Sequence, residues 1–97
     1  MYPDYDTPRL TGPYLDLHTE RQQQRARLGA EQHTLEEWVL ALVENMGDVA
    51  EAVLAVARDT DNPVARRAAV RERTLELGAG VIAVLEHLDT LDEVPTT

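Results

Sequence analysis

Acidic side chains recur in the middle of the chain at a spacing that could support metal chemistry. Glu44, Asp48 and Glu51 are separated by four and three residues, so on a helix they lie on one face within a few ångströms of one another. Asn45 lies beside them. Mg²⁺ prefers such oxygen ligands, usually together with waters and substrate phosphates. The spacing is compatible with a magnesium site, but a solvated helical stripe gives the same pattern, and spacing alone favours the stripe.

A fourth acid, Glu76, falls among small residues rather than in a charged stretch. On a helix, Glu76 projects among small residues, namely Ala65, Ala69, Ala79, Gly80 and Ala83. Small residues of this kind allow close packing between helices, and a buried carboxylate is costly unless it is paired. We therefore expect Glu76 either to bind a metal ion or to form a buried salt bridge with Arg73 or Arg71.

Three helices must position these residues. Thr11-Gly12 followed by Pro13 predicts a helix start, and Gly29 predicts its end, which gives a first helix over residues 13–28. No alternating strand pattern is present in the sequence, so we predict an all-α fold.

The second and third helices have the clearest start signals. Thr34 and Glu37 fit a capping box, from which a helix runs to about Arg58. Asn62 followed by Pro63 predicts the start of a third helix, which runs to about Leu88.

Apolar residues surround most of the second helix. A core-facing stripe is predicted for Leu35, Trp38, Val39, Leu42, Met46, Val49, Val53 and Val56. Leu40, Val43 and Leu54 lie outside this stripe and widen the apolar surface, so the helix should be buried on two sides. Three short helices cannot cover both sides. We therefore predict a three-helix protomer that completes a four-helix-type bundle with another copy, as a homodimer or larger.

On the third helix we expect close interhelical contact at the two glycines. Gly78 and Gly80 each cost roughly 1 kcal/mol relative to Ala in a helix interior, a loss that close packing can offset. Val81, Leu85 and Leu88 are predicted to form the core stripe of this helix.

Composition restricts the organisation and the partners. The chain has 97 residues, enough for one domain, which we divide into an extended arm (1–12), a helical domain (13–89) and a flexible acidic tail (90–97). The net charge of −9, without a basic stripe, argues against nucleic-acid binding. No apolar run is long enough to cross a membrane, and the chain contains no Cys. From the polar residues 1–6 we expect no signal peptide. We expect a cytoplasmic protein.

Two segments resemble the MazG-like group of all-α nucleoside triphosphate pyrophosphohydrolases. LVENMGDVAEAVL (residues 42–54) and ELGAGVI (residues 76–82) are similar to the usual L-x-E-E-x-G-E-L-A-E-A-L and E-L-G-D-V-L patterns of that family. The resemblance covers about residues 34–89. Its most specific part is the acid-Gly-acid spacing joined to the Ala-Glu-Ala run.

The resemblance implies a set of metal ligands on two helices. Glu44 matches the first acid of the family pattern, Asp48 replaces the third, and Glu76 matches the acid of the following helix. Asn45 stands where a second Glu is usual, and Ala79 stands where the family has Asp. Glu44, Asp48 and Glu76 are thus the expected ligands of Mg²⁺, or of Mn²⁺ in its place, with Asn45 as an auxiliary ligand.

The implied function is Mg²⁺-dependent hydrolysis of a nucleoside triphosphate to a nucleoside monophosphate and pyrophosphate. The two departures at Asn45 and Ala79 leave a second interpretation open. In that interpretation the chain is a catalytically degenerate MazG-like protein that serves as a helical assembly or nucleotide-binding module.

Overall fold

A computed structural model describes residues 11–28, 33–58 and 61–92. These residues form three α-helices and no strand: α1 (Pro13–Leu28), α2 (Leu35–Arg58) and α3 (Pro63–Asp92). The predicted all-α fold with three helices is confirmed.

The third helix is longer than predicted. It continues four residues past the predicted end at Leu88, to Asp92. Neither Gly nor Pro occurs between Gly80 and Pro95, so nothing forces an earlier end. Residues 93–97, and residues 1–10 of the predicted arm, lie outside the described part of the chain.

The helices begin at the capping residues that the sequence indicates. The N–H of Glu37 donates to Thr34 Oγ1 (3.1 Å) and the N–H of Thr34 donates to Glu37 Oε1 (2.8 Å), which completes the capping box. At the start of α3, the N–H of Ala65 donates to Asn62 Oδ1 (3.2 Å). Gly12, directly before α1, has a φ of 53°, a conformation that Gly adopts at little cost.

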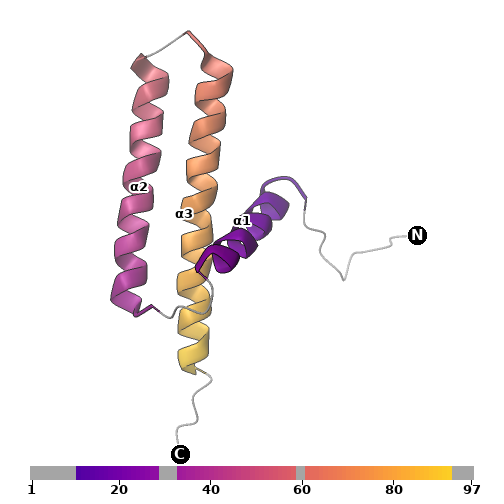
Figure 1. Cartoon of the computed structure of the whole chain (residues 1–97), viewed down its shortest axis with the longest axis vertical. Coiled ribbons are helices and arrows are strands. Elements are labelled where there is room, and N and C mark those ends of the chain that lie inside the picture. Colours follow the sequence, from indigo (N-terminus) through magenta and orange to yellow (C-terminus); the bar gives the residue numbers. More distant parts are fainter. Residues whose placement is uncertain (1–10, 29–32, 59–60, 93–97) are drawn as a thin grey trace, which may run out of the picture.

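α3 is the central helix. Figure 1 shows α2 and α3 side by side as an antiparallel hairpin, with α1 lying obliquely across α3 on the flank away from α2. α3 packs against both other helices. The hairpin therefore has one flank covered by α1 and an opposite flank, formed by α2, that no other part of the described chain covers.

The two glycines of α3 allow both neighbours to approach. A Cβ added at Gly78 would lie 2.6 Å from Leu17 Cδ1 of α1, and one added at Gly80 would lie 2.8 Å from Leu42 Cδ2 of α2. Both distances are shorter than a van der Waals contact. The expected close packing at Gly78 and Gly80 is confirmed, with one glycine for each neighbouring helix.

Only small residues are buried in the part of the chain that the structure describes. They are Ala79, Gly80 and Ala83, all on α3. No large side chain is fully buried. A single copy thus gains little of the apolar burial that stabilises a domain of this size.

The predicted core stripes are only partly buried. On α3 the prediction was wrong, since Val81, Leu85 and Leu88 are 44%, 55% and 38% exposed. The positions that meet α1 and α2 are the small ones, and the larger side chains project elsewhere. On α2, one half of the predicted stripe is half-buried, namely Leu35, Trp38, Leu42, Val49 and Val56.

The other side of α2 is exposed. We call it the outer α2 face, and it comprises Val39, Leu40, Val43, Met46, Val53 and Leu54. Leu40, Val43 and Leu54 are the second apolar side that the sequence predicts. The prediction was wrong for Val39, Met46 and Val53, which were assigned to the core stripe and are exposed. Within the described residues, no helix is both long enough and apolar enough to span a membrane.

Candidate functional site

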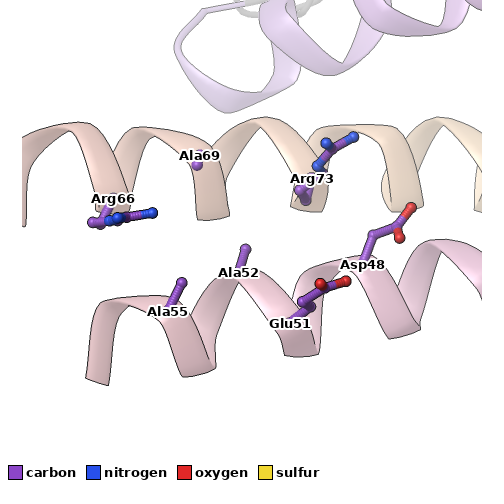
Figure 2. Close-up of a pocket in the computed structure, with 7 residues that line it drawn as sticks. All are labelled: Asp48, Glu51, Ala52, Ala55, Arg66, Ala69 and Arg73. Atoms are coloured by element: carbon purple, nitrogen blue, oxygen red, sulfur yellow. The ribbon is translucent and has the colours of Figure 1, made fainter. Parts of the chain in front are cut away.

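A pocket of about 250 Å³ lies between α2 and α3 beside the conspicuous acids. Its floor is made of alanines and its rim of charged side chains: Asp48, Glu51, Ala52, Ala55, Arg66, Ala69 and Arg73. Figure 2 shows the carboxylates on α2 and the guanidinium groups on α3, with the small alanine side chains between the two helices. Here α2 presents negative charge and α3 presents positive charge to the same opening.

Of the predicted ligands, Asp48 alone lines this pocket. Glu44 is one helical turn away on the same face of α2 and is exposed. Glu51, the third acid of the spaced set, lines the pocket with Asp48. The acidic stripe is therefore partly solvated, as its spacing favours, and partly directed into the pocket.

Glu76 forms a salt bridge with Arg73. Arg73 Nη1 lies 3.3 Å from Glu76 Oε2, and the Glu76 side chain is 28% exposed. The hydrogen bond from Arg73 to Glu76 and the charge of Glu76 raise the pKa of Arg73 above its ordinary value, with smaller contributions from the charges of Asp48 and Glu72. Of the two alternatives expected for Glu76, the structure contains the salt bridge with Arg73, but this pair is partly exposed rather than buried as predicted.

The two departures from the family pattern lie in the packed region between helices. Asn45 is half-buried, and its Nδ2 would be 3.3 Å from a Cβ added at Gly80. Ala79 is 0% exposed. An Asp at position 79 would therefore place a carboxylate in the helix interface, where burial without a partner is costly.

No closed metal site is formed by one copy of the described chain. Within residues 11–28, 33–58 and 61–92, no three His, Asp or Glu side chains come together so that they could hold one metal ion. Glu44, Asn45, Asp48 and Glu76 are thus not gathered into a protein-only ligand set. What the pocket offers is two carboxylates from α2 and two guanidinium groups from α3 in one lining, which suits a cation that also binds phosphate oxygens.

Sequence reasoning did not identify a second pocket, of about 460 Å³, between α1, the start of α2 and the last part of α3. The sequence places Trp38 in the predicted core stripe of the second helix. The pocket contains Trp38 together with His33 and His87. The available signal was the pair Arg21 and Arg25, spaced i, i+4 on an otherwise polar helix.

An ion-pair network forms one wall of this second pocket. Arg21 Nη2 lies 2.7 Å from Glu86 Oε1, and Arg25 pairs with Glu86 Oε2. Although burial alone raises the pKa of Glu86, hydrogen bonds from Arg25 and Arg21 and their charges hold it below its ordinary value. The network joins α1 to α3.

Comparison with known proteins gives no relative for this chain: no family model matches the sequence, and searches of curated proteins and of solved structures found no match.

Proposed function

We propose that the chain is a Mg²⁺-dependent nucleoside triphosphate pyrophosphohydrolase-like protein that acts as a homodimer. The observation that carries this proposal is the pocket lined by Asp48 and Glu51 of α2 and by Arg66 and Arg73 of α3. The resemblance of residues 42–54 and 76–82 to the MazG-like patterns supports the same reaction class. The products are a nucleoside monophosphate and pyrophosphate.

The donor set of the pocket fits Mg²⁺ bound together with phosphates. Mg²⁺ is commonly held by one or two carboxylates, with waters and substrate phosphates completing its shell. Asp48 and Glu51 supply these carboxylates, with Glu44 and the Asn45 amide oxygen as the nearest further ligands along α2. When bound, the ion neutralises phosphate charge and lowers the pKa of a bound water.

The arginines of α3 have the complementary role. Arg66 and Arg73 line the same pocket, and guanidinium groups bind phosphate oxygens through paired hydrogen bonds. Glu76 holds Arg73 by the 3.3 Å salt bridge and thus positions it beside the phosphates. In this proposal Glu76 acts through Arg73.

The homodimer rests on the outer α2 face. Four residues of this face, together with the exposed Ala50 and Ala57, follow steps of four, three, four, three and four residues, the repeat of a helix that packs against another helix: Val39, Val43, Met46, Ala50, Val53 and Ala57. Two hairpins that bury this face against each other form a four-helix bundle. A second copy supplies the apolar partner that the described chain lacks.

A second candidate function keeps the assembly and omits the hydrolysis. The salt bridge of Glu76 with Arg73 and the complete burial of Ala79 favour it, because they leave α3 without the acid pair of the family pattern. The chain would then be a helical assembly module that binds nucleotides without cleaving them.

Pyrophosphate release from a panel of nucleoside triphosphates, with Mg²⁺ and with Mn²⁺, tests the proposal. We expect release by the wild type. Loss of a residue that only hydrogen-bonds to a metal ligand typically lowers activity by roughly 10- to 100-fold. Asp48→Asn removes a proposed ligand itself, so the rate of pyrophosphate release should fall by at least that much. Glu36→Gln is the matched control, because Glu36 is an exposed acid of α2 outside the pocket.

The same proteins separate the two candidates. No release of pyrophosphate, with a thermal midpoint that rises with Mg²⁺-nucleotide in the wild type and not in Asp48→Asn, would favour the binding module. No release and no rise would overturn nucleotide binding at this pocket. Equal loss of activity in Asp48→Asn and Glu36→Gln would show that the pocket is not the site.

A further inference from the structure

The second pocket, between α1, the start of α2 and the end of α3, has the shape and composition of a ligand site. Its volume of about 460 Å³ lies within the roughly 300–1,000 Å³ of small-molecule pockets. Aromatic, imidazole, guanidinium and carboxylate groups line it, contributed by all three helices and by the residues just before α2. None of these residues belongs to the pocket between α2 and α3.

Two aromatic rings make a corner in this pocket. The ring centroids of His33 and Trp38 are 4.9 Å apart and the ring planes meet at 73°. The Arg21 guanidinium carbon lies 5.8 Å from the centroid of the Trp38 ring. Planar heteroaromatic ligands stack on surfaces of this kind, because every such ring has a π-face.

Side-chain hydrogen bonds hold Arg21 in the wall of this pocket. Arg21 Nε donates to Glu86 Oε1 (2.8 Å) and Arg21 Nη1 donates to Gln24 Oε1 (2.7 Å). The Arg21 side chain is only 12% exposed. A rigid wall reduces the entropy that ligand binding must offset.

The pocket also favours an anion. Its lining contains two positive residues, Arg21 and Arg25, and one negative residue, Glu86, which gives a formal charge of +1 when the histidines are neutral. The whole chain, in contrast, has a net charge of −9. The Arg25 side chain is 57% exposed, so it can reach an anionic group at the mouth of the pocket. His87 is half-buried in the lining and offers ring nitrogens for hydrogen bonds.

We infer that this Trp38 pocket binds a planar heteroaromatic ring that carries an anionic group, the chemistry of a nucleotide. The ring stacks at the corner of Trp38 and His33, and the anion pairs with Arg25. The inference goes beyond the proposed function, because binding here requires neither a metal ion nor hydrolysis.

Fluorescence of Trp38 tests this site directly, because Trp38 is the single tryptophan of the chain. The full chain is titrated, with EDTA present, with nucleoside monophosphates, the matching nucleosides, and ribose 5-phosphate. We expect a saturable change of emission with monophosphates, a weaker one with nucleosides, and none with ribose 5-phosphate. Pyrophosphate release is not measured, so this result and that of the hydrolysis assay are independent.

Three variants keep the fluorescent reporter. Arg25→Gln should weaken monophosphate binding by about tenfold, because it removes the proposed partner of the anion. It also removes the ion pair of Arg25 with Glu86, but the Arg21–Glu86 ion pair still joins α1 to α3, so nucleoside binding should be unchanged. His87→Ala should weaken both ligands. Arg67→Gln is the matched control, an exposed arginine of α3 outside this pocket, and should change neither.

Circular dichroism of each variant checks that the helices are retained. If Arg25→Gln loses helical content, Arg25→Lys and His87→Ala decide the question. The inference is overturned by the absence of any saturable change up to millimolar ligand, by an equal response to ribose 5-phosphate, or by equal affinity in His87→Ala and the wild type.

Discussion

The two flanks of the α2–α3 hairpin differ in how they are covered. On the α3 flank, α1 is held by ion pairs, from Arg21 and Arg25 to Glu86 and from Arg71 to Asp16 (2.5 Å). Leu17 packs against Gly78 on the same flank. The α2 flank has no cover in the described chain, and its apolar residues are exposed: Val39, Leu40, Val43, Met46, Val53 and Leu54.

This difference shows what each flank is suited to. The sequence of α1 is strongly polar, so α1 covers α3 and presents mainly polar side chains outward, which do not favour further helix packing. The outer α2 face carries a helix-pairing repeat and no charge along its centre. One flank is thus covered within the described chain, and we propose that a second copy covers the other.

The strongest test of the comparison replaces one exposed valine on each helix of the hairpin. Val43 of the outer α2 face and Val64 of α3 are 65% and 69% exposed in one copy. In a monomer both changes to Arg should have small and similar effects. In the proposed dimer, Val43→Arg places a charge in the interface between the two copies. It should therefore remove the stabilisation that association gives to the folded state, which is about 2.7 kcal/mol when the protein concentration is 100 times Kd. Chemical unfolding of Val43→Arg and Val64→Arg measures the difference.

Glycines sharpen the comparison within the hairpin. A Cβ at Gly80 meets Leu42 and Asn45, whereas one at Gly47 meets nothing within 4 Å. Gly80→Ala should therefore lower the free energy of unfolding by about 1–3 kcal/mol, the usual cost of overpacking, despite its better helix propensity. Gly47→Ala is the matched control and should not lower it. Equal effects of the two changes would contradict the close approach of α2 and α3 at Gly80.

The ion pairs that hold α1 predict a pH dependence. The folded state lowers the pKa of Glu86, so its contribution is present above the ordinary carboxyl pKa and is lost as pH falls through the lowered value. Glu86→Gln should therefore be less stable than the wild type at pH 7, by about 1 kcal/mol because the group is partly exposed. The difference should narrow as pH falls below about 4. A difference that is constant with pH would mean that packing, not charge, holds α1.

The smallest effect concerns the start of α2. Thr34→Ala removes the acceptor of the 3.1 Å hydrogen bond from the Glu37 N–H and should cost about 1 kcal/mol. Thr74→Ala is the control, because Thr74 Oγ1 donates only to Val70 O within α3. Equal thermal midpoints for Thr34→Ala and the wild type would show that the capping box does not limit stability.

Local signals explain how much of the fold was predictable. The capping residues Thr34 and Asn62 define helix starts through hydrogen bonds to residues three positions further along the chain. Gly78 and Gly80 indicate close packing of helices by their small size alone. The exposure of Val81 and Leu85 was not predictable in this way, because helical periodicity identifies an apolar face but not the partner that covers it.

The residues of the candidate sites were likewise predictable where their contacts are local in sequence, and not where the contacts join distant parts of the chain. The stripe of Asp48 and Glu51 follows from spacing along one helix. The contact of Arg21 with Glu86 joins residues 65 positions apart, and only the tertiary structure brings them together. The Glu76–Arg73 salt bridge is local, three residues apart, and was one of the two alternatives that the sequence left open.

The central claim is that the exposed flank of α2 is covered by a second copy. Sedimentation equilibrium of the wild-type chain at micromolar concentration tests it directly. A mass of twice 10.8 kDa, with full helical content by circular dichroism, is the predicted result. A helical species of 10.8 kDa over the whole concentration range would contradict the account, because the outer α2 face would then be stable in water without a partner.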